Sequence, residues 1–322
     1  MSSIAPLLLV PDLRERIWGG TRLAPLLDVE APESGTPYGE AWIAHADSRI
    51  AGGPWEGARL SSVLDEMGEM ILGPHAAGGM PLLIKILDAA QPLSLQVHPD
   101  DAYAATRHPE LGFPGKTESW RILEAENGAT VAWGFEHSMD EAALRDAIAN
   151  GSIETALRSV PVAPGDLVHN PAGTVHAVGA GIVLYEVQQP SDLTYRLHDY
   201  GRVDAAGNPR ELHVEDALAV SDLSGRAPSN PPHRMPRDGW RNRVHCDAYA
   251  LDEVTVPEVN AGDTEGASMH VLTPLDGALT VRTAAGDATV RRACALVVPA
   301  KAGRYQLEGA GTVLRARPVK AA

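Results

Sequence analysis

The sequence predicts a mainly β protein with two β modules, the first of which carries helical insertions. Short stretches of alternating polar and apolar residues, of which 93–98 is the clearest, recur along the chain and are bounded by Gly and Pro. A Pro-rich polar segment then precedes a Val/Leu/Ala-rich remainder with Gly-containing turns. We therefore expect a first module over 1–225, a linker over 226–238 and a second, smaller β-barrel over 239–322.

Composition limits the classes of function. The chain has 322 residues and a formal net charge of −15, which argues against nucleic-acid binding because that function needs a basic face. It holds no apolar run long enough to cross a bilayer. Met1–Val10 lacks the basic start and cleavage site of a signal peptide. We expect a cytoplasmic protein with no membrane partner.

Helices are predicted from capping residues and apolar stripes at 61–70, 101–107, 139–148 and 213–221. The first begins at a serine cap, and the second follows Asp100, whose carboxylate can accept a hydrogen bond from the first turn. The third follows a capping-box pattern that begins at Ser138, and a further helix is expected after Ser152. The helices near 139–160 would form an insertion in the first module.

Strands are predicted in the first module at 81–89, 93–98, 120–124, 129–135, 165–169, 174–178, 182–187 and 193–197. The dipeptide Asn127-Gly128 is typical of a tight turn, and it predicts a hairpin of the third and fourth of these strands. On the strand 93–98, Ser94, Gln96 and His98 share one face, because side chains alternate along a strand. An ordinary half-buried strand would give the same alternation, so downstream motifs must decide its role.

A second motif follows, from Gly165 to His176. It reads Gly, five residues, Pro, one residue, Gly, two residues, His, and it resembles the second signature of the cupin superfamily of small β-barrels. The first cupin signature normally offers His-x-His and, soon after, a Glu. Here Gln96-x-His98 stands in its place, and the Glu lies at position 118.

These departures fit a more particular family. The motifs are Gln-x-His-Pro-Asp-Asp at 96–101, Gly-Lys-Thr-Glu at 115–118, Pro-Ala-Gly-Thr-Val-His-Ala at 171–177 and Glu-Val-Gln-Gln-Pro-Ser-Asp-Leu-Thr-Tyr-Arg at 186–196. With weaker echoes at Ile17–Gly20 and Gly39–Trp42, they resemble the short bacterial form of type I mannose-6-phosphate isomerase. The resemblance implies a cupin (jelly-roll) barrel for the first module and a degenerate cupin-like barrel, without a metal motif, for the second.

Gln96, His98, Glu118 and His176 are the candidate metal ligands. Two imidazoles and one carboxylate with open positions suit a divalent transition metal. The resemblance implies one Zn²⁺ per chain, while the ligand types alone also admit manganese, iron or cobalt. Gln96 is either a ligand through its amide oxygen or a donor that holds a ligand in place.

The reaction that the resemblance implies is interconversion of mannose 6-phosphate and fructose 6-phosphate through a cis-enediol. It needs a base, a positive group facing the developing oxyanion and a phosphate anchor. The resemblance places Asp192 and Arg196 at the mouth of the site, and we expect Arg196 to stabilise the anion. Asp192 is either the base or a side chain that holds Arg196. Lys116 shares a face with Glu118 if that segment is extended, so it could bind phosphate or polarise a hydroxyl.

Substrate binding needs a local cationic pocket, because an acidic protein repels a sugar phosphate at long range. Of the four lysines in the chain, Lys85 and Lys116 flank the metal motif. Lys85 is either a substrate-binding residue or a solubilising charge on an edge strand. Ser94 could donate a hydrogen bond to phosphate, and Glu186 is a further candidate, either contacting substrate or supporting its neighbours.

Two other functions remain open. A cupin isomerase for another sugar phosphate, such as glucose 6-phosphate, would use the same metal ligands. A non-enzymatic sugar-binding cupin would be expected to lose Arg196, Lys116 or a ligand, and all are present. The expected partner is a small-molecule sugar phosphate rather than nucleic acid or membrane, and the expected state is a monomer or homodimer.

Overall fold

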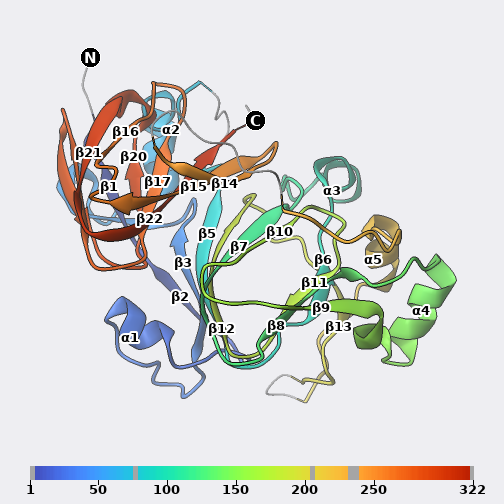
Figure 1. The fold of residues 1–322 in the computed structure, drawn as a ribbon. Coiled ribbons are helices and arrows are strands. Elements are labelled where there is room, and N and C mark those ends of the chain that lie inside the picture. The colour runs from blue at the N-terminus through green and yellow to red at the C-terminus, as the bar shows by residue number, and fades with distance from the viewer. Residues whose placement is uncertain (1–3, 75–78, 204–206, 231–238, 320–322) are drawn as a thin grey trace.

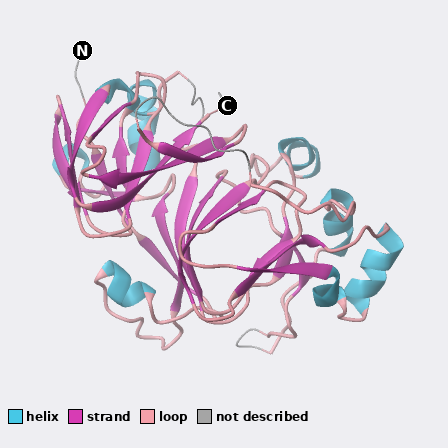
Figure 2. Ribbon diagram, in the orientation of Figure 1, coloured by secondary structure: helices cyan, strands magenta, loops and turns pink. Residues whose placement is uncertain are grey.

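The computed structural model describes residues 4–74, 79–203, 207–230 and 239–319. Strands are the main regular element of both modules, and helices lie at their periphery (Figure 2). The mainly β class is therefore confirmed. Within the described ranges, none of the helices combines the length and the apolar character that a bilayer crossing requires.

The first module is a jelly-roll (cupin) barrel of two antiparallel sheets (Figure 1). The larger sheet has the order β10 (Leu167–Asn170), β7 (Glu118–Ala125), β12 (Ile182–Gln188), β5 (Leu83–Ala89), β3 (Tyr38–Ala44), β2 (Asp12–Glu15). The smaller has the order β13 (Tyr195–His198), β6 (Leu95–Val97), β11 (His176–Val178), β8 (Thr130–Phe135), β9 (Leu157–Pro161). Apolar side chains of the two sheets, such as Trp120 and Ile122 from one and Val131 and Val178 from the other, pack together inside the barrel.

The predicted hairpin at Asn127-Gly128 is wrong in its pairing. The tight turn is present, with the amide of Ala129 donating to the carbonyl of Glu126 at 3.0 Å. The two strands then separate: β7 pairs with β10 and β12, whereas β8 pairs with β9 and β11. Local turn chemistry reverses the chain, but burial of each strand in a different sheet selects its partners.

The predicted helices form, but their caps differ in part. The serine cap predicted for the first helix is wrong, because α2 (Leu60–Ile71) starts after Arg59 and no side chain of the described residues caps it. In α3 (Asp101–Arg107) the Asp100 carboxylate accepts from the amide of Tyr103 at 2.8 Å, which confirms the predicted cap. The cap predicted at Ser138 is wrong, because α4 (Glu141–Ala149) is capped by Asp140. The helix expected after Ser152 is a single 3₁₀ turn, η2 (Ile153–Ala156). Together with α5 (Val214–Val220), α4 covers the end of the first module that lies away from the second (Figure 1).

The second module has two sheets of its own. The larger has the order β14 (Arg241–His245), β15 (Tyr249–Val256), β22 (Gly311–Pro318), β17 (His270–Pro274), β20 (Leu296–Val298), β1 (Leu7–Val10), β4 (Arg49–Ala51). The smaller has the order β16 (Ala261–Asp263), β21 (Arg304–Gly309), β18 (Leu279–Thr283), β19 (Gly286–Val290).

Strand pairing crosses the expected domain boundary. The N-terminal strand β1 pairs with β20, placing Leu7 opposite Val297, and β4 extends the same sheet. The helix α2 (Leu60–Ile71) contacts η3 (Ala300–Ala302) in the second module as well. The division into 1–225, 226–238 and 239–322 stays a prediction, and the N-terminal strands depart from it; residues 231–238 of the expected linker lie outside the described residues.

The two modules share a continuous interface along the outer face of the larger first-module sheet. Ile84 and Tyr185 from that face belong to the same apolar cluster as Tyr249 and Leu314 of the second module. Two polar contacts lie on β7: the hydroxyl of Ser119 is 2.8 Å from that of Tyr249, and Arg121 Nε donates to Glu253 at 2.9 Å. The second module therefore packs directly behind the strand that begins with Glu118.

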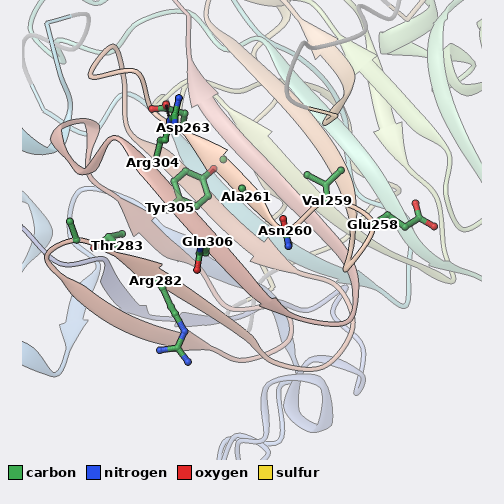
Figure 3. Close-up of a pocket in the computed structure, with 12 residues that line it drawn as sticks. Glu258, Val259, Asn260, Ala261, Asp263, Arg282, Thr283, Arg304, Tyr305 and Gln306 are labelled. Atoms are coloured by element: carbon green, nitrogen blue, oxygen red, sulfur yellow. Dashed lines mark hydrogen bonds and ion pairs between the residues drawn. The ribbon is translucent and has the colours of Figure 1, made fainter.

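A surface cavity of about 790 Å³ lies over β16, β18 and β21 of the second module (Figure 3). Its two arginines already pair with carboxylates: Arg304 with Asp263, and Arg282 with both Asp287 and Glu308. None of the candidate metal ligands lines this cavity. The candidate functional site therefore lies in the first barrel.

Candidate active site

Strand register brings three of the candidate residues into one row inside the first barrel. His176 on β11 lies opposite Gln96 on β6, and Gln96 lies opposite Arg196 on β13. Directly opposed residues of antiparallel strands share a face, so the three side chains project to the same side. The alternation read from residues 94–98 thus marks the inward face of a barrel strand.

The opposite sheet contributes a second row. Glu118 on β7 lies between Asn170 on β10 and Gln188 on β12. Both neighbours share its face, because each is its direct partner in an antiparallel pair. Glu118 therefore projects into the barrel from the wall facing the His176 row.

His98, Glu118 and His176 converge on one point. Their potential ligand atoms all lie within 4.8 Å of one another, and each residue is almost completely buried. Glu118 Oε1 is 3.2 Å from His176 Nε2, and Glu118 Oε2 is 3.4 Å from His98 Nε2. This group can hold a metal ion with two imidazole ligands and one carboxylate.

The Nδ1 atom of each imidazole, His98 and His176, lies within hydrogen-bond distance of a backbone carbonyl oxygen. His98 Nδ1 lies 2.9 Å from the carbonyl of Leu193, and His176 Nδ1 lies 2.8 Å from that of Thr174. Each Nδ1 donates, because a carbonyl only accepts, and Nε2 is therefore the ring nitrogen that faces Glu118 and can ligate a metal. This arrangement orients both rings as metal ligands.

The charges around Glu118 also suit a metal. Burial alone would raise its pKa, but Lys116, His98 and His176 together hold the pKa well below its usual range, so the carboxylate is ionised. Burial, reinforced by Lys116, lowers the pKa of His98 to about 3 and keeps that imidazole neutral. Within the described residues, neither oxygen of Glu118 accepts a well-aligned hydrogen bond. An ionised carboxylate in that state has the capacity to ligate an ion.

Gln96 and Lys116 border this group. Gln96 Nε2 is 3.4 Å from His176 Nε2, and a half-turn of the amide would present its oxygen there instead. Lys116 is buried, with its ammonium 2.9 Å from Glu118 Oε2 and 3.1 Å from His98 Nε2. Lys116 therefore lies against the candidate ligands, as the shared face predicted.

Lys85 is not a solubilising charge on an edge strand, and that interpretation is wrong. Its strand, β5, lies between β3 and β12, and the side chain is buried. The ammonium is 2.8 Å from Glu186 Oε2 and donates to Gln188 at 2.7 Å. Burial would lower the pKa of Lys85, but the Glu186 and Glu40 carboxylates raise it, so the charge is retained and compensated.

Glu186 is held from two sides. Besides the ion pair with Lys85, it accepts from Trp120 Nε1 at 3.0 Å. The Trp120 ring in turn meets the His176 ring edge-on, with centroids 5.3 Å apart. Glu186 therefore holds Trp120 in the wall that faces His176 across the barrel.

Arg196 lies in a cluster of arginines that the sequence did not indicate. It is half-buried and donates to the carbonyl of Glu211 at 2.9 Å. Burial and the neighbouring Arg210 and Arg202 lower its pKa. Arg202 and Arg210 both bond the carboxylate of Asp199, so three guanidinium groups lie near a single buried carboxylate. Arg202 and Arg210 come after the last motif and outside every predicted strand and helix.

Two of the predicted site residues, Asp192 and Ser94, make fewer polar contacts within the described ranges. Asp192 is exposed and, within the described ranges, takes part in no hydrogen bond or ion pair. It precedes Leu193, whose carbonyl holds His98. Ser94 is buried two residues before Gln96. The structure thus assembles the metal candidates, Lys116 and Arg196, and leaves Asp192 at the surface.

A metal-binding cupin is the class that this barrel and its His/Glu/His group define. The family model for the catalytic domain of type I phosphomannose isomerase matches residues 7–114. The mannose-6-phosphate isomerase of Streptococcus mutans is 40% identical over 230 residues, which is 70% of this chain and 71% of the relative. With that identity and coverage, the chain belongs to the type I phosphomannose isomerase family.

Solved structures agree with this assignment. The mannose 6-phosphate isomerase from Bacillus subtilis superposes with a TM-score of 0.87 at 28% identity, covering 97% of this chain and 99% of the other. A mannose 6-phosphate isomerase with bound zinc and yttrium shares the fold at a TM-score of 0.74 and 18% identity, covering 98% of this chain and 100% of the other. The two-module architecture is therefore common to these proteins.

Proposed function

We propose that this protein is a metal-dependent aldose–ketose isomerase that interconverts mannose 6-phosphate and fructose 6-phosphate. The relatives that share its family are named for that activity. The observation that carries the proposal is the convergence of His98, Glu118 and His176 beside the buried ammonium of Lys116. An isomerase needs such a set of polar groups inside a cavity shielded from water.

Zinc is the metal we propose, held by His98, Glu118 and His176, with Gln96 as a further ligand through its oxygen. Two imidazoles with their Nδ1 atoms bound to carbonyls and an ionised carboxylate fit its preferences. When bound, the metal would supply a Lewis acid for adjacent sugar oxygens. A solved protein of this fold binds zinc.

The reaction moves a proton between C2 and C1 of the sugar. Lys116, in contact with the candidate ligands, is placed to polarise a hydroxyl on the reacting carbons. Arg196 shares the inward row with Gln96 and His176, and we propose that it stabilises the oxyanion of the enediol. Asp192 remains a hypothesis for the base, and its exposure requires it to approach the substrate from the mouth of the barrel.

For the phosphate we propose Arg202 and Arg210, the two arginines that lie beside Arg196. Three guanidinium groups near one buried carboxylate, Asp199, leave local positive charge in a protein with a net charge of −15. Lys85 suits this role less well, since its ammonium is already paired with Glu186. Arginine also binds phosphate oxygens in a bidentate manner.

The small-molecule sugar phosphate is the partner we infer. We also propose a cytoplasmic location, on the basis of the composition, and a monomer or homodimer.

The test is conversion of mannose 6-phosphate to fructose 6-phosphate by the purified protein, before and after chelation and after zinc add-back. Activity that is lost with the metal and restored with zinc is the expected result. Absence of turnover by metal-loaded protein would overturn the proposal. Glucose 6-phosphate would then be the next substrate, and a non-enzymatic sugar-binding role would follow if it too were inert.

A further inference from the structure

Asn170, the last residue of β10, has a side-chain amide that none of the roles above uses. The residue is 1% exposed, and within the described residues neither Oδ1 nor Nδ2 has a hydrogen-bond partner. Buried polar atoms in native proteins are almost always paired, so an amide with both ends free calls for a partner from outside the chain.

The position of Asn170 directs that amide into the active site. Asn170 lies directly opposite Glu118 in the β10–β7 pairing, and opposed residues share a face with Cβ atoms about 4.5–5.5 Å apart. On the other side of Glu118 lies Gln188, whose amide is fully used by Lys85 and by backbone carbonyls. Of the two amides that flank the carboxylate, only that of Asn170 is free within the described ranges.

Neighbouring contacts keep Asn170 from turning outward. Trp133 Nε1 donates to the carbonyl of His169 at 3.2 Å, and the amide of His169 donates to Asn230 at 3.0 Å. After the strand, the amide of Gly173 donates to the carbonyl of His98 at 2.9 Å. The backbone on both sides of Asn170 is therefore anchored, and its side chain is held toward the site.

A metal ion explains why neither oxygen of Glu118 accepts a well-aligned hydrogen bond within the described residues, but it does not explain the amide of Asn170. A metal takes the lone pairs of a carboxylate, whereas an NH₂ group can only donate hydrogen bonds. An amide offers a donor and an acceptor side by side, which is the complement of a sugar hydroxyl. We propose that Asn170 is a substrate-binding residue that hydrogen-bonds a sugar hydroxyl next to Glu118; this rests on the isomerase function proposed above.

The proposal predicts opposite effects on the free protein and on the complex. Replacing Asn170 by Leu, of similar size, removes a buried polar group without a partner, so the free protein should unfold at the same or a higher temperature. The same change removes a hydrogen bond to the ligand, so binding should weaken. A residue with only a packing role would instead change stability and leave binding unchanged.

The experiment compares wild-type protein, Asn170→Leu and a control, Val168→Ala, each loaded with zinc. Val168 lies on the same strand and faces the apolar part of the barrel, so its truncation should lower the melting temperature and leave binding intact. Mannitol phosphate, the reduced and non-isomerisable form of the substrate, serves as the ligand in calorimetric titration. Metal content is measured by elemental analysis, and mannose 6-phosphate turnover is measured in parallel.

For Asn170→Leu we expect about tenfold weaker binding, a full metal equivalent and no loss of melting temperature. An unchanged Kd would overturn the proposal, and so would loss of the metal, which would assign Asn170 Oδ1 to the ligand set. If Leu unfolds the protein, Asn170→Val is used with the same criteria. Wild-type protein that neither binds the ligand nor isomerises the sugar would instead refute the proposed function, so the two failures are distinguishable.

Discussion

Glu118→Gln is the substitution whose consequence follows most directly from the structure. The change keeps the shape of the side chain and removes its charge. Lys116, 5% exposed and 2.9 Å from Glu118 Oε2, would then be a buried cation without its closest counter-charge. The substitution should therefore weaken the metal-free protein as well as the metal site.

The magnitude follows from that distance. Two unit charges 2.9 Å apart interact by about 6 kcal/mol at an effective dielectric constant of about 20. Part of this attraction only offsets the free energy needed to bury both charges. Removing one partner of a buried ion pair therefore costs about 3–5 kcal/mol of stability. At roughly 2 °C per kcal/mol for a chain of this length, the melting temperature should fall by about 6–10 °C.

The assay is thermal unfolding of chelated wild-type and Glu118→Gln protein, followed by zinc titration of each. The double variant Lys116→Met/Glu118→Gln is the matched control, because it removes both charges and should recover at least half of the lost stability. Zinc affinity should fall in both variants. A single variant that melts with the wild type in chelator, or that still holds a full metal equivalent, would refute the reasoning.

Three further outcomes are expected. Arg196→Ala should retain the metal and reduce kcat by roughly 10²-fold or more, the scale of one lost anion-stabilising group; wild-type turnover would exclude that role. Asp192→Asn should abolish exchange of the C2 proton with solvent deuterium if Asp192 is the base, and an unchanged exchange rate would exclude it. His169 has its pKa lowered to about 4 by burial, whereas the unfolded chain protonates near 6.5, so stability should be full above pH 6.5 and fall by up to roughly 3 kcal/mol toward pH 4. Denaturant titrations at several pH values should show a smaller loss of unfolding free energy toward pH 4 in His169→Asn than in the wild type. If the unfolding free energy of the two proteins fell equally with pH, His169 would not be the source of the acid sensitivity.

The candidate ligands could be read from the sequence because their signals are local. The alternation along residues 94–98 depends only on strand geometry, and the spacing from Gly165 to His176 depends on one short turn between two strands. The Asp100 cap is likewise a contact between residues three apart. Local patterns of this kind can be recognised in a single sequence without knowing which residues pack against them.

Contacts between residues far apart in the sequence could be identified only from the tertiary structure. Lys85 reads as an edge charge by itself, and only the pairing of β5 with β3 and β12 shows that it is buried against Glu186. Arg202 and Arg210 both meet the carboxylate of Asp199, although no periodic pattern in the sequence relates these residues.

By itself, the sequence determined the β class, the inward face of the strand at 93–98, the candidate metal ligands and the resemblance to one isomerase family. Only the tertiary structure decided that β7 and β8 join different sheets, that β1 pairs with the second module, and that Asn170 stands unpaired beside Glu118 within the described residues. The physical reason is that alternation and turn chemistry act over a few residues. Strand partners and the pairing of buried polar groups depend instead on which segments, far apart in the sequence, pack against each other and exclude water.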